Sequence, residues 1–282
     1  MPALLCPVCR KTLTKTEKTY FCPNGHSFDR AKSGYVNLLR SSAKGKRHGD
    51  DKLMVKARTA FLNGGYYARL SKEIAACVER YAPKTVQVLD AGCGEGTYTL
   101  DVLRHLTAAG KKAEIVGVDI SKEALHDAAR RSDAIQLAVA SCADLPLADQ
   151  SVDVLLNVFA PFVQQEFFRV LRPGGVLIRV YPLEKHLWEL KELIYDTPYE
   201  NRVTDMEETG FTILERRKLC YRIHLEDPAM IMNLFRMTPY YYKTGLSDQK
   251  KAEQATVLDT EVAFGILIYE RRADIEQQGT EP

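Results

Sequence analysis

The sequence lacks any apolar run long enough to cross a membrane, and it contains no internal repeats. No stretch of its 282 residues approaches the roughly 20 apolar residues that a spanning helix needs. The N-terminus, MPALLCPVCR, has no basic segment followed by a long apolar one, so no signal peptide is predicted. The hydrophobic content of 45% and charged content of 27% are ordinary for a globular protein. We therefore expect a cytoplasmic protein that makes no membrane contact.

Net charge is also nearly absent, but the charge is unevenly distributed. The whole chain carries +2, whereas Met1 to Leu70 holds 14 Lys and Arg against 4 Asp and Glu, an excess of ten positive charges. The remainder is correspondingly acidic. A basic front on an acidic body suggests an anionic partner, and the alternative is a solvated, Lys-rich surface that binds nothing.

The chain has an odd number of cysteines, so they cannot all pair in disulfides within one chain. Four of its seven cysteines are scattered through the body, which is typical of free thiols in a reducing compartment. The other three cluster near the N-terminus. Cys6 and Cys9 are separated by two residues, and Cys22 and His26 by three.

This cluster has the spacing of a tetrahedral zinc site built from two short turns. Four protein ligands leave no open coordination position, so we predict a structural zinc ion rather than a catalytic one. The alternative is three unrelated thiols and a surface histidine. A segment this short cannot bury enough core to fold alone, and bound zinc would supply the missing stability.

A basic stretch follows the cysteine cluster. Lys44, Lys46 and Arg47 lie among small residues, which indicates a flexible linker or loop. We expect it to contact phosphates, although simple solvation would give the same composition. The chain is thus divided into a zinc module over residues 1–40, a basic linker with helices over 41–84, and a catalytic body over 85–282. The middle part is expected to hold helices over 52–62 and 66–81.

The body opens with the stretch VLDAGCGEG, in which Asp90 precedes glycines at 92, 94 and 96. The apolar residues before Asp90 predict a buried strand, and a helix is expected to begin near Thr97. Gly92, Gly94 and Gly96 let the backbone turn sharply and let a ligand approach it closely. The helix start presents free N–H groups and a positive dipole end to that ligand.

Strand-like and helix-like segments alternate from this point, which predicts an α/β fold with a parallel sheet covered by helices on both faces. Ligands bind beyond the carboxyl ends of such strands. Asp119 ends the second strand, where an acid can bind both ribose hydroxyls of a nucleotide, or the position is simply a helix cap. Asp144 follows the third strand.

The D-x-G-x-G form of this turn resembles motif I of the class I S-adenosylmethionine-dependent methyltransferases. A nicotinamide-binding fold is the alternative, but its third glycine would come one residue later. The resemblance implies a mostly parallel, Rossmann-like sheet of seven strands ending in an antiparallel hairpin, here expected over 212–223 and 255–269. It also implies that Asp144 accepts a hydrogen bond from the adenine amino group. Asn157, near the end of the fourth strand, is a weak candidate for the catalytic or substrate site, or an ordinary strand-end residue.

The whole chain is similar to a narrower family, the 23S rRNA (guanine-N1)-methyltransferases of the RlmA type. The matching stretches are CPVC…CPNGHSFD, AKSGYVNLL, HGDDKLMVKAR, FLNGGYY, VLDAGCGEGTYT, YPLEKHLWELKELIY and FRMTPYYYK. This resemblance implies methylation of a guanine in a 23S rRNA hairpin near the macrolide site, with S-adenosylmethionine as donor. Some members protect against certain macrolides.

The resemblance also implies further contacts to the donor. By position these are Tyr67 and His186, beside Glu95 and Gly96, although a core tyrosine and a helix-surface histidine would explain the first two equally. Tyr240, Tyr241 and Tyr242 are candidates to stack on RNA, or they fill the core of the hairpin.

Two other functions stay open at this point. One is a small-molecule methyltransferase of the quinone-biosynthesis sort, which would leave the zinc module unexplained. The other is a non-catalytic RNA-binding protein with a relict donor pocket. The sequence also leaves open whether the protein forms a homodimer.

Overall fold

The structure is a computed structural model that describes residues 3–40, 49–203 and 206–273. Its strands are β1 (Thr14–Lys15), β2 (Thr19–Phe21), β3 (Ser27–Asp29), β4 (Val36–Asn37), β5 (Thr85–Ala91), β6 (Lys112–Asp119), β7 (Ile135–Val139), β8 (Val152–Val158), β9 (Leu171–Pro182), β10 (Phe211–Leu225) and β11 (Leu258–Arg271). Its helices are α1 (Lys52–Asn63), α2 (Ala68–Tyr81), α3 (Thr97–Ala108), α4 (Lys122–Ala129), α5 (Gln164–Val170), α6 (Trp188–Ile194), α7 (Pro228–Arg236) and α8 (Leu246–Gln254), with a 3-10 turn at Tyr241–Lys243.

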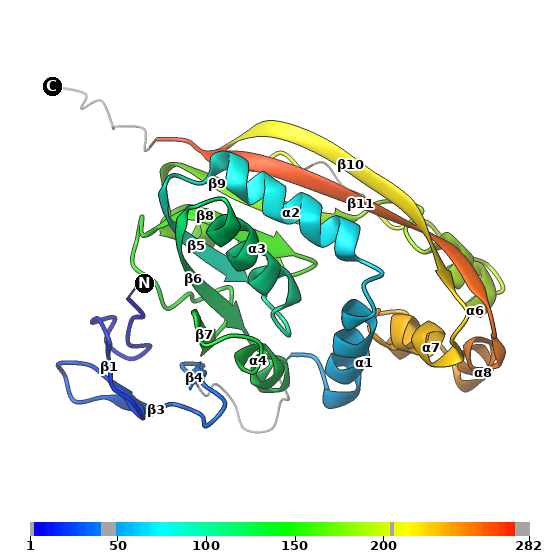
Figure 1. The fold of residues 1–282 in the computed structure, drawn as a ribbon, viewed down its shortest axis with the longest axis horizontal. Coiled ribbons are helices and arrows are strands. Elements are labelled where there is room, and N and C mark those ends of the chain that lie inside the picture. The colour runs from blue at the N-terminus through cyan, green and yellow to red at the C-terminus, as the bar shows by residue number, and fades with distance from the viewer. Residues whose placement is uncertain (1–2, 41–48, 204–205, 274–282) are drawn as a thin grey trace, which may run out of the picture.

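One large sheet carries the body, in the order β10-β11-β9-β8-β5-β6-β7-β4. Strands β4 to β9 of this sheet run parallel, whereas β11 pairs antiparallel with both β9 and β10. Figure 1 shows α2 and α3 covering one face of the sheet, with α1, α7 and α8 gathered at the end of the long β10–β11 hairpin. The parallel pairing places the loops after β5, β6, β7 and β8 along one edge, where a ligand site is expected.

The predicted class I sheet of seven strands, β5 to β11, is confirmed, but the sheet has an eighth strand. β4 comes from the N-terminal module, and Val36 and Asn37 lie opposite Ala138 and Val139 of β7. The next residue, Leu38, donates its N–H to the carbonyl of Val139 at 2.9 Å. A strand of two residues is too short to show an alternating pattern, so the sequence alone could not reveal this pairing.

The two faces of the sheet have separate hydrophobic cores. Residues that alternate along β5 point to opposite sides, so Val88 packs in the core under α2 and α3, and Leu89 packs in the core that includes residues of α5. Apolar residues of the zinc module, including Leu4, Leu13 and Tyr20, belong to the second core. The module therefore covers part of the catalytic body rather than standing apart from it.

Local signals position the helices around the site. The side chain of Asp51 accepts the N–H of Met54 at 2.8 Å and begins α1, and Ser121 caps α4 in the same way. Helix α2 begins at Ala68, two residues later than predicted, which leaves Tyr67 at its cap position. Among the residues that the structure describes, no helix is long and apolar enough to cross a membrane.

Candidate donor site and metal centre

The predicted zinc ligands come together at one point of the N-terminal module. The ligand atoms of Cys6, Cys9, Cys22 and His26 all lie within 4.8 Å of one another. The Sγ atoms of Cys9 and Cys22 are 3.6 Å apart, and Nδ1 of His26 lies 3.3 Å from Sγ of Cys22 and 3.6 Å from Sγ of Cys6.

These separations match a tetrahedral metal site. With zinc–sulfur bonds of about 2.3 Å and zinc–nitrogen bonds of about 2.0 Å, neighbouring ligand atoms lie about 3.5–3.8 Å apart. Burial raises the pKa of the Cys22 thiol, but hydrogen bonds from the backbone and ring of His26 outweigh it and hold that pKa at about 6. The donor set therefore fits a structural zinc ion.

The glycine loop follows β5 at the carboxyl edge of the sheet. Gly92, Gly94 and Gly96 have φ values of 93°, 56° and 82°, a region that favours glycine. A Cβ on Gly92 would collide with that of Ala160, so the loop packs closely against the segment after β8. At Gly94 such a Cβ would have one neighbour within 4 Å among the described residues, a nitrogen of Arg58 at 3.7 Å. The loop thus has an open face at Gly94.

Asp90 supports this loop from inside the protein. Its Oδ2 accepts a hydrogen bond from the hydroxyl of Thr99 at 2.6 Å, while its buried Oδ1 has no hydrogen-bond partner among the described residues. Burial raises the pKa of Asp90 to about 7, and the nearby carboxylates of Asp119 and Glu95 act in the same direction. Asp90 therefore ties β5 to the start of α3 through Thr99.

Asp119 faces the glycine loop from the end of β6. Its two oxygens accept the N–H groups of Gly94 at 2.9 Å and Ser121 at 2.8 Å. Burial raises its pKa, although these two backbone hydrogen bonds act in the opposite direction. The predicted contact of Asp119 with the ribose hydroxyls stays a prediction.

Sequence reasoning missed Arg58 of α1, whose side chain lies near the carboxylates of Asp119 and Glu95. Its Nη1 forms an ion pair with Asp50 at 2.5 Å. Burial lowers the pKa of Arg58, but the carboxylates of Asp50, Glu95 and Asp119 outweigh it. Arg58 is therefore a partly buried cation at the edge of the donor loop, suited to an anionic group of a ligand. The stretch HGDDKLMVKAR contains it, but only the packing of α1 shows where it points.

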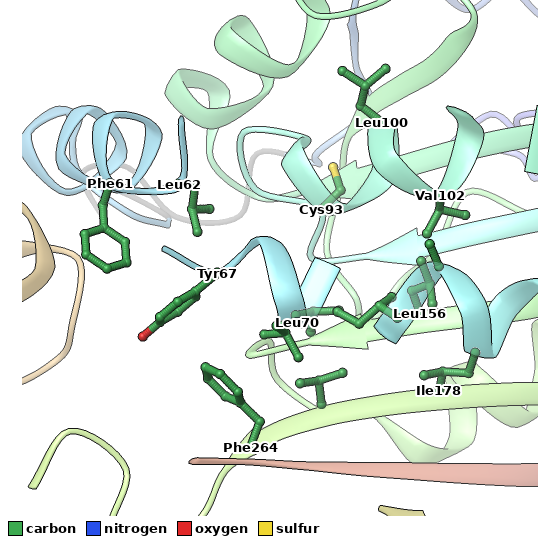
Figure 2. Close-up of a cluster of buried hydrophobic side chains, with 14 of the residues drawn as sticks. Phe61, Leu62, Tyr67, Leu70, Cys93, Leu100, Val102, Leu156, Ile178 and Phe264 are labelled. Atoms are coloured by element: carbon green, nitrogen blue, oxygen red, sulfur yellow. The ribbon is translucent and has the colours of Figure 1, made fainter. Parts of the chain in front are cut away.

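The two additional donor candidates, Tyr67 and His186, are both buried beside Phe264 of β11. The ring of Phe264 lies 5.0 Å from that of Tyr67 and 4.8 Å from that of His186. Figure 2 shows Tyr67 directed toward Phe264 in this cluster. The hydroxyl of Tyr67 has no hydrogen-bond partner among the described residues, which leaves a buried polar atom for a ligand.

His186 is neutral and has a defined tautomer. Its Nδ1 accepts the N–H of Ala263 at 3.1 Å, so Nε2 carries the proton. Burial and the charge of Lys191 lower its pKa to about 3. His186 can therefore donate a hydrogen bond from Nε2 at any physiological pH.

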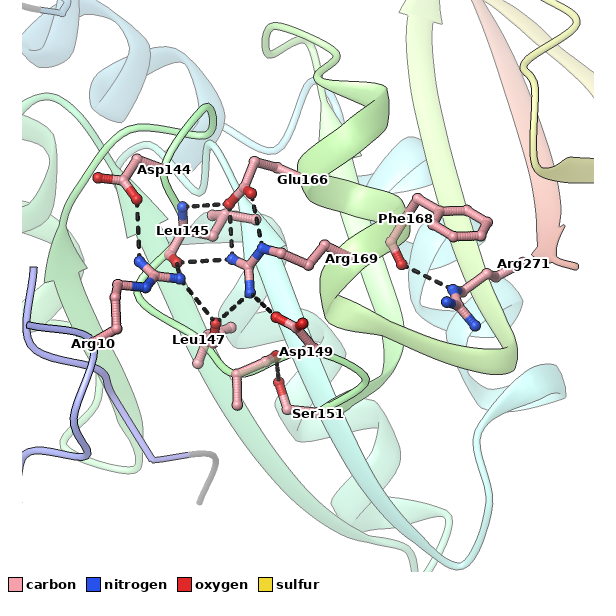
Figure 3. Close-up of polar contacts among 11 residues, drawn as sticks. Arg10, Asp144, Leu145, Leu147, Asp149, Ser151, Glu166, Phe168, Arg169 and Arg271 are labelled. Atoms are coloured by element: carbon pink, nitrogen blue, oxygen red, sulfur yellow. Dashed lines mark hydrogen bonds and ion pairs between the residues drawn. The ribbon is translucent and has the colours of Figure 1, made fainter. Parts of the chain in front are cut away.

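Asp144 lies on the turn after β7, and the structure directs its carboxylate at the zinc module. Its Oδ1 forms an ion pair with Nη1 of Arg10 at 3.1 Å (Figure 3). Arg10 also donates to the carbonyl of Leu145 at 3.1 Å. The predicted contact of Asp144 with adenine stays a prediction, and Arg10 is a second residue at this position that sequence reasoning missed.

Two protein families match the two parts of this structure. Residues 4–47 match the family described as "RlmA, N-terminal", and residues 83–243 match a "Methyltransferase domain" family. The 23S rRNA (guanine(748)-N(1))-methyltransferase of Streptomyces fradiae is 41% identical over 234 residues, covering 80% of this chain and 81% of that protein. The protein YxjB of Bacillus subtilis (strain 168) is named for the same type of reaction. It is 30% identical over 275 residues, which cover 93% of this chain and 96% of YxjB.

The chain belongs to the 23S rRNA (guanine-N1)-methyltransferase family. Among other relatives, a ubiquinone/menaquinone biosynthesis C-methyltransferase from Syntrophotalea carbinolica is 38% identical, but over only 33% of this chain and 42% of that enzyme. Among solved structures, the YcgJ protein of Bacillus subtilis is 14% identical with a TM-score of 0.48, covering 72% of this chain and all of that one.

Asn157 of this family member is buried at the end of β8. Its Nδ2 donates to the carbonyls of Ala91 and Pro161, each at 3.2 Å. These bonds join the strand that carries the glycine loop to the segment after β8. The structure thus gives Asn157 a positioning role, and its predicted catalytic or substrate role remains a prediction.

The RNA-binding candidates fall into two groups. Lys44, Lys46 and Arg47 lie outside the described residues. Tyr240 is buried and donates its hydroxyl to Oδ1 of Asn201 at 3.1 Å, and Tyr241 packs against Phe235. Tyr242 is 50% exposed and donates to Oδ2 of Asp51 at 2.9 Å. Of the three tyrosines, Tyr242 thus has the most ring surface available to RNA.

Proposed function

We propose that this chain transfers a methyl group from S-adenosylmethionine to N1 of a guanine in a 23S rRNA hairpin near the macrolide site. The observation that carries the proposal is the union of a Cys3His module with a class I methyltransferase body, matched over 80% of the chain by an enzyme named for this reaction. Because rRNA is the substrate, the reaction belongs in the cytoplasm.

The donor is held at the carboxyl edge of the sheet. Asp119, hydrogen-bonded to the N–H of Gly94, would bind the ribose hydroxyls, and the absence of a side chain at Gly94 would let the donor approach the loop closely. Arg58 offers a cation for the methionine carboxylate, in place of its present partner Asp50. The hydroxyl of Tyr67, which has no hydrogen-bond partner in the described part of the chain, completes the polar contacts.

The chemistry is a single displacement. Guanine N1 bonds to the methyl carbon while the carbon–sulfur bond breaks, its electron pair passes to sulfur, and the N1 proton is released. The chain's main contribution is to hold two reactants in line, which is worth about 7–11 kcal/mol when the geometry is good. His186, neutral and protonated on Nε2, can donate a hydrogen bond at this site but cannot act as a base through that nitrogen.

The zinc module is proposed to help recognise the RNA. Zinc holds its two turns together, and the module presents apolar Val8 and Phe21 to solvent at 54% and 42% exposure. Lys11, Lys15 and Lys18 are exposed on the same module. Exposed aromatic and basic side chains suit contact with bases and phosphates of RNA.

The small-molecule alternative has less support. The quinone-biosynthesis relative matches only a third of this chain, so it offers no counterpart for the zinc module. A non-catalytic RNA-binding protein would have no use for the support that Asp90 and Thr99 give to the donor loop.

Label transfer tests the proposal. The protein is incubated with methyl-labelled S-adenosylmethionine and unmodified 23S rRNA, and the product is read by primer extension. N1-methylguanine cannot form a Watson–Crick pair, so we expect one new stop in a single hairpin. Donor binding without label in RNA would contradict the proposal and favour a small-molecule substrate.

A further inference from the structure

Phe159 occupies an unusual position directly after β8. It is a large apolar residue that is 44% exposed, although it lies at the ligand edge of the central sheet. Its neighbour Ala160 packs against Gly92, the first glycine of the donor loop. The ring of Phe159 thus stands beside the loop that would hold the methyl donor, without being part of the buried core.

The backbone holds this ring outward at a conformational cost. Phe159 has a φ of +53°, which residues with a side chain rarely adopt. Its N–H donates to the carbonyl of Val180 at 3.1 Å. The side chain of Asn157 donates to the carbonyls of Ala91, at the end of β5, and Pro161, just after Phe159. A bulky residue held in this conformation by specific hydrogen bonds indicates a functional constraint on the direction of its ring.

The ring continues a wall of aromatic side chains. Phe159 lies 5.6 Å from Phe264 and 6.5 Å from Tyr98, measured between ring centroids. Phe264 in turn contacts Tyr67 and His186. Phe264, Tyr67 and His186 are nearly completely buried and Tyr98 is half-buried, so among the described residues of this wall Phe159 has the most exposed ring.

The order of the strands indicates the side from which a second molecule would approach. Asp119 ends β6, on one side of the glycine-loop strand β5, whereas Phe159 follows β8 on the other side. The nucleoside end of the donor belongs with Asp119. The position of Phe159 is therefore open to the second reactant, which meets the donor from the β8 side.

We infer that Phe159 is the surface on which the target guanine stacks once it leaves its RNA helix. This inference rests on the proposed function, because it takes a purine of RNA as the second reactant. A flat aromatic ring beside the donor loop matches the π-face of an unpaired base, and stacking is a common means of holding such bases. Phe159 would then set the distance and angle between the guanine and the methyl group.

Substitutions at position 159 separate this role from a structural one. We expect Phe159→Ala and Phe159→Gly to reduce kcat/KM for 23S rRNA methylation by about 5- to 150-fold, the range given by the loss of one stacked base. Phe159→Tyr should stay within about fivefold of the wild type, because it keeps the ring. The affinity for S-adenosylmethionine, measured by calorimetry, should change less than about twofold in all three variants.

The glycine variant provides the sharpest control. Glycine adopts a φ of +53° without strain whereas alanine does not, and both variants lose the same ring contacts, so Phe159→Gly should melt no lower than Phe159→Ala while losing activity. Gln150 has a similar φ of +51° at the opposite end of β8, and Gln150→Gly relieves the same kind of strain without changing methylation. Wild-type methylation by Phe159→Gly, or a parallel loss of donor affinity, would overturn the inference.

A fluorescence measurement tests stacking directly. Trp188 is the single tryptophan of the chain, so Trp188→Phe combined with Phe159→Trp places one reporter at the proposed surface. Adding 23S rRNA in the presence of S-adenosylhomocysteine should quench it, whereas unchanged emission with RNA bound would overturn the inference. Failure of the proposed function would be distinct, because the wild-type protein itself would then transfer no label to rRNA.

Discussion

Arg10 of the zinc module forms an ion pair with Asp144 of the catalytic body, with 3.1 Å between Nη1 and Oδ1. Arg10 follows the zinc ligand Cys9, and it also donates to the carbonyl of Leu145. On the other side of this turn, Arg169 of α5 donates to the carbonyls of Leu145 and Leu147 (Figure 3). The turn where adenine is expected is thus held by side chains from both the module and the body.

This relationship yields the first prediction, which concerns the donor's adenine. If Asp144 accepts from the adenine amino group, Asp144→Ala weakens S-adenosylmethionine binding by about 10-fold, the equivalent of one hydrogen bond to a charged group. Arg10→Ala is the matched control, since it breaks the same ion pair but keeps the carboxylate. The pair itself is exposed, so its loss should cost no more than about 1 kcal/mol of stability. Equal donor affinity in both variants would exclude the adenine contact.

The second prediction concerns the ribose. Asp119→Ala should reduce affinity for S-adenosylmethionine at least about 10-fold, because each hydrogen bond to a charged group contributes about 1.5–3 kcal/mol. Asp119→Asn keeps the size of the side chain, so its affinity for S-adenosylmethionine should lie between those of the wild type and Asp119→Ala. Zinc content, measured by metal analysis, should stay at the wild-type level in both variants. Unchanged donor titration in the alanine variant would remove Asp119 from the donor site.

The third prediction concerns zinc. Replacing Cys9 and Cys22 together by serine should abolish zinc binding and reduce affinity for 23S rRNA, while donor binding survives below the melting temperature. Because Cys22, Leu4 and Tyr20 lie in the second core of the sheet, the loss should also lower the melting temperature of the whole protein. Cys220→Ser is the matched control, since Cys220 is an exposed free thiol on β10. Full rRNA methylation by the double variant would reject a role for the module in recognition.

The fourth prediction concerns pH and Asp90. Its pKa is about 7 in the folded protein, against an ordinary value of about 3.9 in an unfolded chain. The folded state binds the proton more tightly, so this contribution to stability is complete below pH 4 and is lost as the pH rises through 7. The difference between these two pKa values corresponds to at most about 4 kcal/mol of folding free energy.

Denaturant unfolding of the wild type and Asp90→Asn measures this contribution. The free energy of unfolding of the wild type should decline between pH 4 and pH 7 relative to that of the asparagine variant, which cannot titrate. A constant difference between the two proteins over this range would show that Asp90 is not the group responsible.

The predictable parts of this structure are those whose signals are local. Gly92 and Gly94 have positive φ values, which glycine adopts readily and which a tight turn requires. The four zinc ligands converge because the spacing within each pair closes a short turn. The alternation of strands and helices then determines where the turn lies in the sheet.

The remaining features depend on tertiary packing, which leaves no local pattern. Strand β4 has only two residues, and its pairing with β7 is decided by how the module docks. Arg58 looks like an ordinary surface charge on α1 until that helix packs over the donor loop. Phe159 has the φ of a glycine without being one, so nothing in the sequence marks its turn.

The nature of the methylated nucleoside tests the central claim most directly. Unmodified 23S rRNA is incubated with the wild-type protein and labelled S-adenosylmethionine, digested to nucleosides, and separated by chromatography with mass detection. We predict that the label elutes as 1-methylguanosine at close to one methyl group per rRNA molecule. Label in another methylated nucleoside, or none in the RNA despite donor binding, would contradict the account.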